Sequence, residues 1–104
     1  MAQFDVYLNP NPATNKIIPY YLNVQADLLD TLNTRAIVPL VRDKEMGKSV
    51  KDLHLKFKVK GEIVVMSTAE LAGLPIRALG EKVTSLKSKR DEIIAALDLV
   101  FTGF

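Results

Sequence analysis

The chain ends in an amphipathic stretch, residues 84–104, which reads TSLKSKRDEIIAALDLVFTGF. Its apolar residues recur with the 3.6-residue period of a helix, so they line one helical face. They are Leu86, Ile93, Ile94, Leu97, Val100 and Phe101. The pattern predicts a helix over about 86–101 that packs this face on the core and stops at Gly103. Phe104 then either folds back as a core plug or stays exposed for a partner.

The residues before this helix form a series of short predicted strands. Five segments predict strands: three alternate apolar and polar side chains, as half-buried strands do, and the third and fifth are short apolar runs. These segments are residues 3–8, 17–25, 35–41, 54–59 and 62–67. In the first, we expect Phe4, Val6 and Leu8 to face the core and the side chains between them to face outward. Because Pro39 lacks a backbone donor, we expect its strand to lie at an edge or to carry a bulge.

Turn-forming residues separate these strands. Residues 9–15 are rich in Pro and Asn and predict a loop, and the polar residues 42–52 predict a second, longer loop. Lys60 and Gly61 predict a tight hairpin turn between the last two strands.

The segment between the last strand and the helix carries weaker signals. We expect one short helical turn over residues 69–73 and, at best, an extended segment over 74–79. Strands joined by short turns pair antiparallel. The sequence therefore predicts a single, mainly β domain over residues 1–104, in which a strongly bent sheet or partial barrel carries one C-terminal helix.

Composition sets the class of protein. A length of 104 residues with 48% hydrophobic and 25% charged residues is ordinary for one globular domain. No run of 18 apolar residues predicts a transmembrane helix, and the N-terminus lacks the pattern of a secretory signal. The absence of Cys fits a cytoplasmic protein. A net charge of +2 is too small to indicate nucleic-acid binding.

Candidate catalytic and metal-binding residues are few. His54 is the only histidine and lies in a lysine-flanked strand, so we expect a surface histidine, no metal and no cofactor. Asp27 and Asp30 could form an acid–base pair, but carboxylates near a turn are more often capping groups. No glycine-rich phosphate loop is present.

Lysines give the clearest charge pattern. Seven of the fourteen Lys and Arg residues lie between Arg42 and Lys60. Lys56, Lys58 and Lys60 occupy the outward face of one predicted strand, where they could follow phosphates. We favour a solvated face that blocks edge-to-edge aggregation, because no aromatic residue alternates with the lysines to stack on bases.

Five segments in one register resemble a known family. They are QFDVY at 3–7, NVQADLLD at 23–30, VPL at 38–40, LGEKV at 79–83 and FTGF at 101–104. Together they resemble the CcdB toxins of bacterial toxin–antitoxin systems, over the whole chain. The resemblance implies a homodimer with a C-terminal helix on an SH3-like barrel, built around a five-stranded antiparallel sheet.

The same resemblance implies a function. The chain would be a binder rather than an enzyme, a toxin that binds the A subunit of DNA gyrase and traps the gyrase–DNA cleavage complex. A CcdA-like antitoxin, with a segment that folds on binding, would neutralise it. Neither a membrane partner nor sequence-specific DNA binding by the toxin alone is expected.

The family's gyrase-binding residues carry over to two parts of this chain. The tail corresponds to Thr102, Gly103 and Phe104, with Asp98, Ala26 and Leu28 as a supporting surface. Gly103 matches the family pattern. Phe104 stands where the best-known member has a branched aliphatic residue, so a bulky apolar side chain is kept. Thr102 departs from the pattern because it replaces a Trp.

The expected antitoxin-binding residues lie in the two predicted loops. They are Asn11, Arg42, Asp43, Lys44 and Lys48. The excess of basic residues in the second loop would suit an acidic antitoxin segment.

Two other functions stay open on the sequence. An endoribonuclease of the MazF type, which shares the fold, would need catalytic basic and hydroxyl groups, with Arg35 and a nearby Ser or Thr as candidates. A structural module without a toxic partner is the third alternative.

Overall fold

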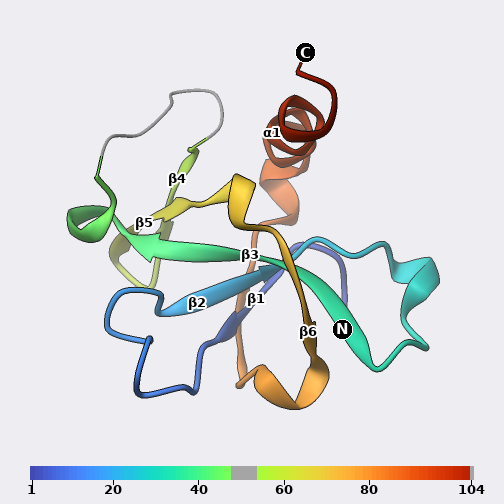
Figure 1. Cartoon of the computed structure of the whole chain (residues 1–104), viewed down its shortest axis with the longest axis horizontal. Coiled ribbons are helices and arrows are strands. Elements are labelled where there is room, and N and C mark those ends of the chain that lie inside the picture. The colour runs from blue at the N-terminus through green and yellow to red at the C-terminus, as the bar shows by residue number, and fades with distance from the viewer. Residues whose placement is uncertain (48–53, 104) are drawn as a thin grey trace.

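A sheet of antiparallel strands forms the body of the computed structural model, which describes residues 1–47 and 54–103. Seven strands are present in these residues: β1 (Asp5–Leu8), β2 (Tyr20–Asn23), β3 (Thr34–Arg42), β4 (Lys56–Val59), β5 (Glu62–Met66), β6 (Ala72–Pro75) and β7 (Lys82–Ser85). They pair in the order β4-β5-β3-β2-β1-β7, and β6 pairs with β3. Figure 1 shows them curling into a half-barrel with the single α-helix at one end. The predicted bent sheet with one helix is confirmed, although the expected five strands are seven.

β3 is the central strand of this sheet. It pairs with β2 along one side, while β6 and then β5 occupy its other side. Pro39 lies between the β6-paired and β5-paired parts of β3, and its carbonyl accepts a hydrogen bond from the Ser67 N–H over 3.0 Å. The prediction of an edge strand or bulge is therefore wrong. A proline is tolerated here because its missing backbone N–H falls at the gap between the two partner strands, where no inter-strand hydrogen bond is needed.

The core lies on the inner face of the half-barrel. Alternate residues of the strands are fully buried there, among them Val6, Leu22, Val38, Leu40, Val59, Val64 and Met66. The expected alternation in the first strand holds only in part. Asp5 and Tyr7 are buried as well, whereas Leu8 is 40% exposed. The pairing between β1 and β7 is irregular between Val6 and Tyr7, which disturbs the simple two-residue alternation.

The β4–β5 hairpin follows the sequence prediction closely. Phe57 and Val59 are buried, and Lys56 and Lys58 point to solvent. Both turn residues, Lys60 and Gly61, have positive φ angles of 49° and 77°. This is the conformation of a two-residue hairpin turn whose twist matches that of the strands.

α1 (Arg90–Thr102) begins later than predicted, after a 3₁₀ turn at Lys87–Lys89. Its end is as predicted, because Gly103 adopts a left-handed φ of 76° and donates its N–H to the carbonyl of Leu99. Only Ile93 and Ala96 of the helix are buried. The apolar face is thus a core face at Ile93 and Ala96, with Ile94 and Leu97 packed partly against the core, whereas Phe101 at its end is exposed.

Two strands were not predicted from the sequence. β6 contains Gly73 and Pro75, which both disfavour strands, and pairs with the first half of β3. β7 pairs with β1 and carries a single large apolar residue, Val83. Both strands therefore depend on partners distant in the sequence, and such pairing overrides weak local preference.

Candidate partner-binding sites

The end of α1 exposes three neighbouring side chains. Asp98, Phe101 and Thr102 are spaced i, i+3 and i+4, so they share one helical face. Phe101 is 67% exposed. The Thr102 hydroxyl donates a hydrogen bond to the Asp98 carbonyl over 2.7 Å, which holds the side chain against the helix. We call Asp98, Phe101, Thr102 and the exposed Gly103 the helix tip. Phe104 lies outside the described residues.

Phe101 was not predicted as a site residue, because its helical spacing assigned it to the core. The core contacts of the helix are made by Ile93 and Ala96, and Phe101 lies beyond them along the helix and is solvent-exposed. The signal available in the sequence was the FTGF segment, in which an aromatic residue lies two positions before the helix-ending Gly103.

A second exposed surface lies between β2 and β3, where η1 (Asp27–Leu29) forms one 3₁₀ turn. Leu28 is 91% exposed, and Leu29 and Leu32 are 46% and 47% exposed. Monomeric proteins rarely display several large apolar side chains together without a binding role. Leu29 and Leu32 were not predicted as site residues. We call residues 26–33 the leucine loop.

The five predicted gyrase-binding residues that lie within the described part of the chain do not meet in one place. Ala26 and Leu28 lie in the leucine loop, at one side of the half-barrel, whereas Asp98, Thr102 and Gly103 lie at the helix tip. Figure 1 shows these two regions well apart. One chain therefore presents two separate surfaces.

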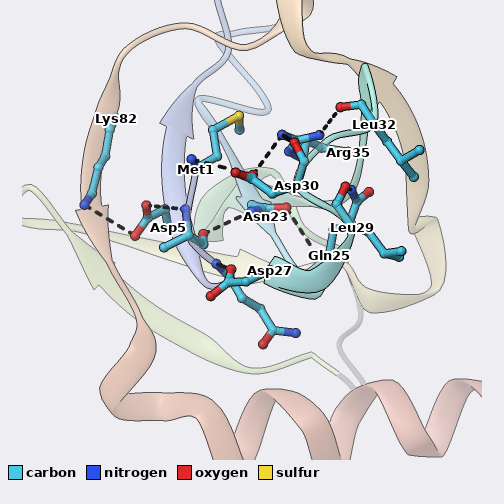
Figure 2. Close-up of polar contacts among 12 residues, drawn as sticks. Met1, Asp5, Asn23, Gln25, Asp27, Leu29, Asp30, Leu32, Arg35 and Lys82 are labelled. Carbon is cyan, nitrogen blue, oxygen red and sulfur yellow. Dashed lines mark hydrogen bonds and ion pairs between the residues drawn. The ribbon is translucent and has the colours of Figure 1, made fainter.

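Arg35, on β3, directs its side chain to the leucine loop and is 4% exposed. Its Nη1 donates to the carbonyls of Leu32 and Thr34 over 2.5 and 2.8 Å. Its Nη2 donates to the carbonyl and to Oδ1 of Asp30 over 2.8 and 3.0 Å (Figure 2). Asp30 Oδ1 also lies 3.8 Å from the α-amino nitrogen of Met1. Arg35 thus uses its guanidinium for hydrogen bonds within the protein. The sequence did not indicate these bonds, because most of their acceptors are main-chain carbonyls.

These contacts bear on two chemical alternatives, an acid–base pair of Asp27 and Asp30 and a catalytic role of Arg35. Asp30 pairs with Arg35, and Asp27 Oδ1 accepts the Gln3 N–H over 2.7 Å, so both carboxylates hold the local structure, although neither caps the 3₁₀ turn. The buried guanidinium of Arg35 contacts carbonyls and a carboxylate, with no hydroxyl among its hydrogen bonds in the described part of the chain. The geometry does not support Arg35 as a group that acts on RNA.

A buried carboxylate joins β1 to β7 next to the leucine loop. Asp5 Oδ2 accepts hydrogen bonds from the Ala2 N–H over 3.1 Å and from the Tyr7 hydroxyl over 3.3 Å. Asp5 Oδ1 lies 3.4 Å from Lys82 Nζ (Figure 2). Burial raises the pKa of Tyr7 to about 12, and the neighbouring Asp5 carboxylate acts in the same direction.

A groove of about 290 Å³ lies between the loop after β1 and the end of β3. Its lining is Leu8, Asn9, Asn15, Lys16, Pro19, Tyr20 and Arg42. Arg42 fixes one wall, because its N–H donates to the Ile17 carbonyl over 2.9 Å and its Nε donates to the Lys16 carbonyl over 2.7 Å. Arg42 also forms an ion pair with Glu62. The two loops predicted to bind the antitoxin therefore adjoin.

The other predicted antitoxin-binding residues differ in their surroundings. Asn11 is exposed and shapes its loop, since its Oδ1 accepts the Ala13 N–H over 3.0 Å. Asp43 forms an ion pair with Lys56 over 3.1 Å, and Lys44 is exposed. Lys48 lies outside the described residues.

The remaining expectations concern metals and membranes. Within residues 1–47 and 54–103, no group of three or more His, Asp and Glu side chains is arranged to hold a metal ion. None of the described helices is long and apolar enough to cross a membrane. Lys58 and Lys60 are exposed as predicted for the outward strand face.

Comparison with known proteins identifies relatives by sequence and by fold. A family model described as "CcdB protein" matches residues 3–103. Among solved structures, an endoribonuclease from Mycobacterial species has a TM-score of 0.73 and 12% identity, covering 97% of this chain and 90% of that one. The Mycobacterium tuberculosis toxin MazF-mt6 has a TM-score of 0.74 and 13% identity, covering 93% and 95%.

A third structure, an endoribonuclease in complex with its cognate antitoxin from Mycobacterial species, has a TM-score of 0.73 and 12% identity over 97% of this chain and 94% of that one. At these identities the structural likeness establishes a shared fold alone. The family match covers nearly the whole chain and is specific in sequence.

Proposed function

This chain belongs to the CcdB protein family, toxins of toxin–antitoxin systems, and on that premise we propose that it binds the A subunit of DNA gyrase and traps the gyrase–DNA cleavage complex. The helix tip is the observation that carries the proposal. It presents an aromatic side chain that is 67% exposed, on a helix closed by a left-handed glycine. Such a rigid support lowers the entropy lost when a partner binds.

Phe101 supplies the aromatic contact that Thr102 lacks. In the proposed complex, Phe101 buries its ring against gyrase, which contributes about 2–3 kcal/mol. Thr102 lies on the same helical face and contributes its methyl group and hydroxyl at the rim. Aromatic residues near the centre of an interface commonly dominate the binding energy.

The proposed active form is a homodimer with the two helix tips near its axis. Ile94, Leu97 and Val100 support this, because these apolar residues of α1 are only half-buried among the described residues of one chain. A second copy would cover them, and burial of apolar surface is the main force of association. Two leucine loops and two helix tips would then form one composite gyrase surface.

The proposed antitoxin site is the groove at the end of β3. Support comes from the adjoining loops and from the cations Lys16, Arg42 and Lys44 at or beside the groove. An antitoxin of the CcdA kind would lay an acidic, extended segment there. A similar partner is known from the related fold, where an endoribonuclease was solved with its cognate antitoxin.

Binding to gyrase requires no catalytic group on the toxin. The alternative is RNA cleavage, as in the fold relatives described as endoribonucleases. The buried and fully engaged Arg35 argues against the cleavage site considered for that activity. RNA cleavage by the pure protein, without gyrase, would contradict the proposal.

A gyrase assay tests the proposed function directly. The intact chain should inhibit supercoiling and accumulate cleaved DNA. A chain without residues 102–104 should lose both effects and keep its thermal stability. A protein that unfolds after this deletion would mean that the tail is part of the core. A folded deletion variant with full activity would place the gyrase contact elsewhere.

A further inference from the structure

We propose that Arg35 is a positioning residue for partner binding, whose buried guanidinium fixes the leucine loop so that Leu28 is presented to gyrase A in its bound conformation. The inference rests on the proposed function, because gyrase A is the occupant of that surface. It adds a role for a residue that does not itself reach the surface.

The leucine loop lacks an apolar anchor of its own. No residue of η1 is buried, and the loop's three leucines, Leu28, Leu29 and Leu32, are between 46% and 91% exposed. Loops with few buried contacts open at low free-energy cost and sample many conformations. A loop that displays its apolar residues must be held from within by polar contacts.

The guanidinium of Arg35 provides these contacts. Its four hydrogen bonds reach the carbonyls of Asp30, Leu32 and Thr34 and the side chain of Asp30. The planar fork of an arginine can bridge several acceptors at once, whereas the single ammonium of a lysine cannot span the same carbonyls. Arg35 thus ties the second half of the loop to β3, which it belongs to.

Gln25 holds the loop from the opposite end. Its Nε2 donates to the Leu29 carbonyl over 3.0 Å, and its Oε1 accepts the Ala36 N–H over 2.9 Å. Figure 2 shows the carbonyl of Leu32 turned toward Arg35, while the side chains of Leu29 and Leu32 point away. The carbonyls are occupied inside the loop and the leucines face outward.

This arrangement has a consequence for affinity. A loop already in its bound shape loses little conformational entropy on binding, and a loosened loop binds in proportion to the fraction of competent conformers. Arg35→Lys should therefore weaken binding to gyrase A on the order of tenfold while the sheet stays folded. Arg90→Lys makes the same chemical change at an exposed arginine and should leave affinity unchanged.

The experiment measures the Kd for the gyrase A subunit and amide hydrogen exchange in the free toxin. In Arg35→Lys, exchange should rise at Leu29, Asp30 and Leu32, whose amides donate within the loop, and should stay unchanged in β2. A double-mutant cycle with Leu28→Ala separates positioning from general destabilisation. If Arg35 acts through Leu28, its substitution should change the Kd less than about twofold in the Leu28→Ala background.

Each outcome decides between the two proposals. A wild-type chain that does not bind gyrase A overturns the proposed function and this inference with it. Wild-type binding together with an unchanged Kd for a folded Arg35→Lys variant overturns this inference alone. An effect of equal size in the Leu28→Ala background also overturns it. If Arg35→Lys fails to fold, Asp30→Asn removes the ion pair at a half-exposed site and should weaken binding in the same direction.

Discussion

Gly80 lies so close to Leu8 that a Cβ at position 80 would stand 2.9 Å from the Cβ of Leu8 and 3.0 Å from its carbonyl oxygen. The Gly80 N–H donates to this same carbonyl over 2.8 Å, which fixes the approach of the segment before β7 to the end of β1. The contact includes backbone atoms, so neighbouring side chains cannot relieve it by rotation.

Gly80→Ala should lower the free energy of unfolding by about 1–3 kcal/mol, the usual cost of overpacking. Gly73→Ala is the matched control, because a Cβ at position 73 would meet no atom within 4 Å. Urea denaturation of the two variants gives the comparison. Equal free energies of unfolding for the two variants would show that the backbone between β1 and β7 shifts to accommodate the added Cβ at little cost.

Tyr7 should make the folded state sensitive to alkali. Its pKa is raised from 10.0 to about 12, so between these values the folded state keeps a proton that the unfolded state releases. The free energy of unfolding should therefore be intact below pH 10 and fall as the pH rises toward 12, by at most on the order of 2–3 kcal/mol.

Tyr7→Phe should remove this slope, and the loss of the hydroxyl's bond to Asp5 accompanies it. Urea denaturation across the alkaline range measures the slope for each protein. Tyr21→Phe is the control, because it leaves the Asp5 contact in place. An identical fall of stability in wild type and Tyr7→Phe would assign the alkaline transition to other groups.

Phe101→Ala should weaken binding to gyrase A by about 2–3 kcal/mol without unfolding the protein, because the ring is 67% exposed. Ile63→Ala removes another exposed apolar side chain, 43% exposed on β5, and should leave the affinity unchanged. Calorimetric or surface-based Kd values with the gyrase A subunit provide the measurement. Loss of the homodimer in Phe101→Ala, with the affinity per folded dimer retained, would move Phe101 from the gyrase contact to the dimer interface.

Local patterns predicted the parts of the fold that depend on local interactions. The β4–β5 hairpin is encoded by alternation and by Lys60-Gly61, and the end of α1 by Gly103. β6 and β7 were not predicted, because their stability comes from pairing with β3 and β1. The strand with Pro39 was expected to lie at an edge or to carry a bulge, because the sequence does not reveal where two partner strands meet.

Only some residues of the candidate sites could be predicted from the sequence. The resemblance led to the helix tip and to Leu28, both of which are exposed in the described chain. Phe101 was not predicted, because helical spacing cannot tell how far along a helix the contact with the core continues. The contacts of Arg35 could not be predicted from the sequence, because three of its acceptors are main-chain carbonyls, which every residue possesses.

Lys44→Glu tests the proposed antitoxin groove through its charge. Lys44 is exposed in the 3₁₀ turn Asp43–Glu45 beside Arg42, which lines the groove. Reversing a charge at the rim of an interface mainly changes the association rate, and salt screens the effect. We expect the association rate with an acidic antitoxin segment to fall about three- to tenfold at low salt and less at high salt. Lys87→Glu, exposed in the turn before α1, is the control for net charge. An equal fall in both variants would show that overall charge attracts the antitoxin, and no fall in either would place its binding away from the groove.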